Sequence, residues 1–161
     1  MKIFFIQCLL LTIILSQPFT QLQTLTSPSS WTDYIDISYD NRIISIANRD
    51  HRVYIYTRHN NSTIFSIHQT IGDSSSEVYV ADLTGDGKML LVVEESAWVK
   101  IYSNINNRFT LLQVIIPMDE PKKINTVTTT DDHEWVVFGT WSNVVEIYKH
   151  NGIESTKNQK F

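Results

Sequence analysis

The sequence predicts an all-β fold built from repeated four-stranded units, and three observations support this prediction. Short segments recur at a constant spacing, their apolar residues alternate with polar ones, and their residues are mainly β-branched or aromatic. Alternation with a period of two and this composition are typical of strands rather than helices. A chain of 161 residues, 42% of them hydrophobic, is long enough to bury the core of one such domain.

The repeat has a spacing of 46 residues and occurs three times. It is marked by three tyrosines that end similar segments, and by three aspartates upstream of them: Tyr56, Tyr102 and Tyr148, and Asp40, Asp86 and Asp132. Apolar positions between these residues keep the same register in all three copies. Such a period indicates a repeat architecture. We therefore expect units at about 33–75, 76–121 and 122–161.

The second unit shows the order of its strands most clearly. Strands are expected at 78–83, 89–95, 98–103 and 109–115, with a tight turn at 85–88 after the first of them. Four short antiparallel strands within about 46 residues form the blade of a β-propeller. The sequence therefore predicts propeller-type blades, about three in number, in a partial or oligomer-completed propeller.

One turn carries a family resemblance. In WD40 repeats an Asp opens the turn between the second and third strands, six residues before an aromatic residue that ends the third strand. The segment DHRVYIY at 50–56 has Asp50 and Tyr56 in those places. The chain therefore resembles the WD40 family over residues 18–161, which implies a WD40-like propeller but no particular subfamily. The pattern is degenerate, because Ser96 and Ser142 replace the Asp and no Gly-His pair opens a unit.

The two ends of the repeat region raise the question of how the ring closes. FTQLQTL at 19–25 is similar to the expected outer strands at 65–71 and 109–115, whereas the tail at 150–161 is polar. We therefore expect 19–25 to be a closing strand for the last unit. Propellers have about four to eight blades, so three units leave three alternatives open. In the first, two chains form a homodimer that completes a six-bladed ring. In the second, partner domains add blades. In the third, the chain is a truncated descendant of a longer propeller.

The N-terminus predicts a signal peptide at residues 1–17. Lys2 precedes an apolar run at 3–15, which has the length of a signal-peptide core and is too short for a membrane span. An uncleaved signal-anchor is the alternative. Two overlapping glycosylation sequons begin at Asn60 and Asn61. We therefore expect a secreted, extracellular glycoprotein without membrane contact after cleavage.

The net charge of −4, without a dense run of Lys or Arg, excludes a nucleic-acid surface and a polybasic lipid anchor. The segment DLTGDGK at 82–88 resembles the Asp-rich calcium loops of integrin-type propeller repeats. Asp82, Thr84 and Asp86 are the candidate calcium ligands implied by that resemblance, although Leu90 stands where the later acidic ligand would fall. The alternative is a tight hairpin turn, in which Asp and Gly supply positive φ angles. No other cofactor is expected.

The sequence contains no recognisable catalytic motif. Its histidines lack the spacing of metal or catalytic pairs, and GxSxG is absent. We therefore expect a secreted, non-enzymatic interaction or scaffold module, whose blades present loops to a protein partner. The alternative is a calcium-dependent adhesion or carbohydrate-binding module, in which Trp141 would contact the ligand.

Overall fold

The computed structural model describes residues 20–26, 29–72, 75–116 and 123–150, together with the strand at 155–160. The predicted signal peptide at 1–17 lies outside the described residues, as does Phe19. The described residues contain no helix of the length and hydropathy needed to cross a membrane.

In the part of the chain that the structure describes, twelve strands form three antiparallel four-stranded sheets, which confirms the predicted all-β fold of propeller-type blades. The first sheet contains β1 (Thr32–Ile37), β2 (Ile43–Asn48), β3 (Arg52–Thr57) and β4 (Ser66–Ile71). The second contains β5 (Val78–Leu83), β6 (Met89–Glu94), β7 (Val99–Ile105) and β8 (Arg108–Ile115). The third contains β9 (Ile124–Thr129), β10 (Trp135–Thr140), β11 (Val145–His150) and β12 (Ser155–Lys160). Strands are adjacent in sequence order within every sheet, as in a propeller blade.

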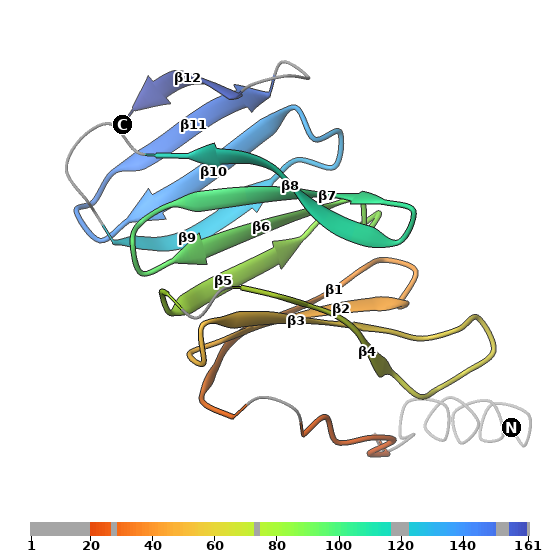
Figure 1. The fold of residues 1–161 in the computed structure, drawn as a ribbon. Coiled ribbons are helices and arrows are strands. Elements are labelled where there is room, and N and C mark those ends of the chain that lie inside the picture. Colours follow the sequence, from red (N-terminus) through yellow and green to blue (C-terminus); the bar gives the residue numbers. More distant parts are fainter. Residues whose placement is uncertain (1–19, 27–28, 73–74, 117–122, 151–154, 161) are drawn as a thin grey trace, which may run out of the picture.

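The three sheets are stacked face to face, with the first and third at the two ends of the stack (Figure 1). The first strands β1, β5 and β9 lie next to one another across the stack. This arrangement brings equivalent turns of successive sheets together. Residues about one repeat apart in the sequence therefore become neighbours in space when they lie in these turns.

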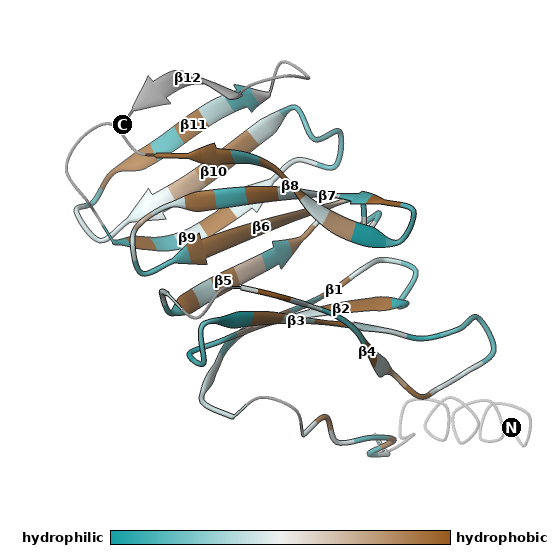
Figure 2. Ribbon diagram, viewed as in Figure 1, coloured by the Kyte–Doolittle hydropathy of each residue, from teal (hydrophilic) through white to brown (hydrophobic). Residues whose placement is uncertain are grey.

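The hydrophobic core lies in the two spaces between the sheets. One cluster joins the first and second sheets and another joins the second and third. Every residue of β6 is buried, because the second sheet is covered on both faces. Figure 2 accordingly shows β6 as hydrophobic along its length. The alternation expected for a half-buried strand is thus replaced by a continuous apolar run in the middle blade.

The third sheet differs from expectation at its outer edge. Its fourth position is occupied by β12, which pairs with β11 although its sequence, STKNQK, is entirely polar. Strand pairing uses backbone groups, so a polar segment can complete a sheet. Residues 20–25, the described part of the expected closing strand at 19–25, form no strand and lie beside the first sheet, at the opposite end of the stack (Figure 1).

Candidate functional site

The turns between the first and second strands of the three sheets have the same structure. Each is closed by an aspartate of the 46-residue repeat, whose carboxylate accepts a hydrogen bond from the hydroxyl two residues before it and from the N–H two residues after it. These donors are Ser38 and Arg42 for Asp40, Thr84 and Lys88 for Asp86, and Thr130 and Glu134 for Asp132. The repeated aspartate is therefore a turn former.

The residue after each aspartate has a positive φ angle, which completes the turn. These angles are 57° at Asn41, 71° at Gly87 and 61° at His133. Asn and Gly are the residues that most readily adopt this conformation. The other two sheets carry Asn41 and Gly87 at the position of His133, and both are better suited to this conformation than histidine. The imidazole of His133 is therefore not needed for the turn to fold.

The structure brings two of the three candidate calcium ligands together and separates the third. Thr84 Oγ1 donates to Asp86 Oδ1 at 2.9 Å. The carboxylate of Asp82 instead accepts a hydrogen bond from the Tyr34 hydroxyl at 2.9 Å. Burial raises the pKa of Asp82 above its ordinary value, and the hydrogen bond from Tyr34 opposes this rise. The integrin-type resemblance is not supported, and calcium binding stays a prediction.

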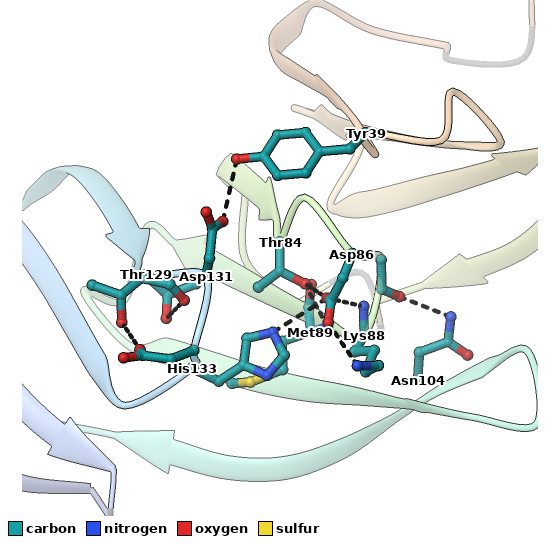
Figure 3. A network of polar contacts seen from close by, with 12 residues as sticks. Tyr39, Thr84, Asp86, Lys88, Met89, Asn104, Thr129, Asp131 and His133 are labelled. Atoms are coloured by element: carbon teal, nitrogen blue, oxygen red, sulfur yellow. Dashed lines mark hydrogen bonds and ion pairs between the residues drawn. The ribbon is translucent and has the colours of Figure 1, made fainter.

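Tyr39 connects the turns of all three sheets (Figure 3). Its N–H donates to the carbonyl of Gly85 in the second turn at 2.7 Å. Its hydroxyl reaches the third turn and donates to Asp131 Oδ1 at 3.2 Å. A Cβ atom on Gly85 would lie 2.2 Å from the ring of Tyr39, so glycine is required for this ring to cover the second turn.

The second and third turns meet through a histidine–aspartate pair. His133 Nε2 lies 3.2 Å from Asp86 Oδ1, and the His133 side chain is 20% exposed (Figure 3). The Lys88 ammonium group lies 2.9 Å from Asp86 Oδ2. Burial alone would raise the pKa of Asp86, but hydrogen bonds from Lys88 and Thr84 lower it to about 2. Asp86 is therefore ionised throughout the neutral range.

The pair of His133 and Asp86 has the arrangement of an oriented general base. Because a carboxylate only accepts hydrogen bonds, Nε2 of His133 carries the proton and Nδ1 is left as the basic nitrogen. A neighbouring carboxylate fixes the tautomer and stabilises the imidazolium that forms when the base takes up a proton. The geometry thus supports proton abstraction from water or a hydroxyl group.

A groove of about 590 Å³ lies between the first and second sheets and is lined by Asp86 and Lys88, but not by His133. Its lining is part polar and part apolar, carries charges of both signs, and includes Asp40, Arg42, Arg58 and His68. A groove of this size can hold a small polar molecule. Asp86 and Lys88 therefore belong both to this groove and to the contact with His133.

Sequence reasoning missed this pair because the histidines were compared only with near neighbours in the chain. His133 and Asp86 are 47 residues apart and meet because equivalent turns of adjacent sheets are stacked. The repeat pattern did contain the information needed to find the pair. Asp86 and Asp132 are equivalent residues of adjacent turns, and His133, the residue after Asp132, faces the turn that contains Asp86. Trp141, the other candidate contact, is exposed in the turn between β10 and β11, at the opposite ends of the strands.

Comparison with known proteins establishes the fold but no family. No family model and no curated protein matches the chain. Among solved structures, Sqt1 from Saccharomyces cerevisiae has a TM-score of 0.72 at 15% identity, over 87% of this chain and 38% of its own. A protein from Bacteroides uniformis with the assigned name 6-phosphogluconolactonase has a TM-score of 0.71 at 14% identity, over 86% of this chain and 46% of its own. The periplasmic gluconolactonase PpgL from Pseudomonas aeruginosa has a TM-score of 0.67 at 12% identity, over 85% of this chain and 41% of its own.

These similarities confirm a WD40-like β-propeller fold, and the chain spans less than half the length of each of the three proteins. The expectation of a protein partner stays a prediction, because the similarity to Sqt1 at 15% identity shows the fold alone. The expectation of a non-enzymatic scaffold is wrong, as is its alternative of a calcium-dependent adhesion or carbohydrate-binding module. The same fold is carried by proteins named gluconolactonases, so this fold does not exclude catalysis.

Proposed function

We propose that the chain is a hydrolase of sugar lactones that uses His133 as its general base. The observation that carries this proposal is the 3.2 Å contact of His133 Nε2 with Asp86, in a part-exposed position. The names of two structural neighbours, which specify gluconolactone and its 6-phosphate, supply the substrate class.

The proposed reaction is the addition of water to a cyclic ester. Nδ1 of His133 removes a proton from water, and the resulting hydroxide attacks the carbonyl carbon of the lactone. The bond between this carbon and the ring oxygen then breaks, and the imidazolium returns its proton to the departing oxygen. The product is the open hydroxy acid. Asp86 stabilises the imidazolium, and Lys88 places a positive charge in the same cluster, where it favours the negative charge developing on the carbonyl oxygen.

Replacing His133 with asparagine tests the proposal. We expect the wild-type protein to accelerate hydrolysis of glucono-δ-lactone above its spontaneous rate. The enzymatic rate of His133→Asn should be about 100-fold lower, because general base catalysis contributes a factor of about that size. The turn should be preserved, since Asn41 holds the equivalent position with a similar φ angle. Acid release at constant pH measures the rate.

His51→Asn is the matched control. His51 also has a positive φ angle, but it lies in the turn between β2 and β3, at the opposite ends of the strands. Its asparagine variant should retain wild-type hydrolysis. Equal loss in both variants, or wild-type activity in His133→Asn, would refute a catalytic role for His133.

We also propose secretion, N-glycosylation and assembly as a homodimer. Asn60 and Asn61 are exposed in the loop between β3 and β4, which makes both amides accessible to a glycan. The described residues form three sheets, fewer than the roughly four to eight blades of closed propellers, which favours completion by a second copy.

Expression in a eukaryotic secretory host tests the first two of these proposals. We expect glycosidase treatment to lower the mass of the secreted chain, and the double variant Asn60→Gln, Asn61→Gln to show no such change. Because the sequons overlap, single variants are needed to identify the asparagine that carries the glycan. Retention of the chain inside the cell, or an unchanged mass after treatment, would contradict secretion or glycosylation respectively.

A further inference from the structure

One face of the first sheet is open over β1, at positions that are buried in the second sheet. Ile35 and Ile37 in β1 are 62% and 44% exposed. The equivalent residues of the second sheet, one repeat further along, are Ala81 and Leu83, which are 0% and 4% exposed. Since the fold around these positions is the same, the difference arises because no sheet of the described residues packs on this side of the first sheet.

The third sheet has the complementary open face. Val145 in β11 is 42% exposed, whereas the equivalent residues Val53 and Val99 are 1% and 0% exposed. Ile147 is likewise partly exposed, and its equivalent Ile55 is fully buried. These positions are covered in the first and second sheets because another sheet follows each of them.

The two open faces are the two halves of one kind of interface. Between the first and second sheets, the face with Val53 and Ile55 packs against the face with Ala81 and Leu83. On the third sheet, Val145 and Ile147 form the face that is equivalent to the one with Val53 and Ile55. On the first sheet, Ile35 and Ile37 form the face that is equivalent to the one with Ala81 and Leu83. The chain thus presents both halves, each without its complement in the described residues.

A glutamine contact shows how the outer strands of consecutive blades are joined. The side-chain amide of Gln69 in β4 holds the backbone of Phe109 in β8, donating to its carbonyl at 2.8 Å and accepting from its N–H at 2.9 Å. Gln23 makes the same pair of bonds with Phe65, both at 2.8 Å. Residues 20–26 therefore stand before the first sheet where the outer strand of a preceding blade would stand.

We propose that a second copy of this chain supplies the preceding blade, by packing its third sheet against the open face of the first sheet. Two such joints, related by a twofold axis, close a ring of six blades, within the usual range for propellers. In this ring, residues 20–26 become the outer strand of the third sheet of the partner copy, in place of β12. Leu25 packs against the cluster of Ile46, Tyr54 and Tyr56, whereas β12 has no apolar residue to contribute.

A second copy is favoured over an unrelated partner because each open face complements the other at equivalent repeat positions. An unrelated protein would have to reproduce the shape of a sheet that the chain already contains. A joint between unlike faces gives a closed ring only if the rotation per copy closes, and otherwise gives an open polymer. With three blades per copy, two copies give six blades, a number within the range of closed propellers.

Light scattering on the purified, deglycosylated chain tests the proposal, with one charged substitution on each face. The wild-type chain should have twice the mass of one chain. Ile35→Lys and Val145→Lys should each give monomers with an unchanged circular dichroism spectrum, because both side chains are exposed in the single chain. An equimolar mixture of the two variants should recover dimers, since one joint is then formed by two intact faces. The matched control, Ile105→Lys, replaces another exposed isoleucine, in the hairpin between β7 and β8, and should remain dimeric.

Three results would overturn the proposal. A monomeric wild-type chain would show that the open faces do not associate, and dimers that persist in both lysine variants would place the contact elsewhere. A ladder of larger species would show that the joint forms without closing, as expected of a fragment that needs the remainder of a longer propeller.

Discussion

Replacing Lys100 with methionine is expected to lower the free energy of unfolding by about 3–5 kcal/mol, because it leaves a buried carboxylate without its partner. Lys100 Nζ lies 2.6 Å from Glu94 Oε1, and the two side chains are only 17% and 7% exposed. Methionine preserves most of the volume of the lysine stem and removes the charge. Denaturation by guanidinium chloride, followed by tryptophan fluorescence, measures the loss.

The double variant Glu94→Gln, Lys100→Met separates charge from volume. Neutralising both partners removes the uncompensated charge, so at least half of the lost stability should return. If Lys100→Met alone costs less than about 1 kcal/mol, the range of solvent-exposed ion pairs, the interpretation of a buried, desolvated pair would be wrong.

Phe138→Ala is the second substitution with a large expected effect. Phe138 is fully buried in the cluster between the second and third sheets, and its ring stacks on Tyr148 with a centroid distance of 5.2 Å. Removing the ring loses its apolar burial and leaves a cavity, at an expected cost of about 3–5 kcal/mol. Urea denaturation at neutral pH measures the change in the transition midpoint.

A smaller substitution at the same site controls for this effect. Phe138→Leu retains most of the apolar volume and should cost less than half as much as alanine, because a smaller cavity remains. Gly139→Ala lies next in the chain, and its added Cβ would be 3.3 Å from the nearest atom, Thr126 Cγ2. That contact needs only a small adjustment. Equal losses for Phe138→Ala and Gly139→Ala would contradict a packing origin of the effect.

The strands of the second sheet could be predicted from sequence because its repeat is complete and its turn residues are distinctive. The segments predicted at 78–83 and 89–95 coincide with β5 and β6 within one residue. By contrast, β12 could not be predicted from its polar composition, because its pairing with β11 depends on backbone hydrogen bonds.

The candidate site was only partly visible in the sequence. The repeated aspartates were found, but their role in the turn depends on hydroxyl groups two residues earlier, such as Thr84 beside Asp86. The contact of His133 with Asp86 depends on the stacking of two sheets, which a one-dimensional pattern does not show. Alignment of the three repeats predicts equivalent positions, whereas contacts between non-equivalent positions of adjacent repeats require the structure.

The most direct test of the proposed function is the rate of glucono-δ-lactone hydrolysis by the purified chain, compared between wild type and His133→Asn. The geometry of His133 and Asp86 predicts hydrolysis above the spontaneous rate for wild type, with about 100-fold of the enzymatic rate lost in the variant. Identical rates for the two proteins would contradict a catalytic site at these turns.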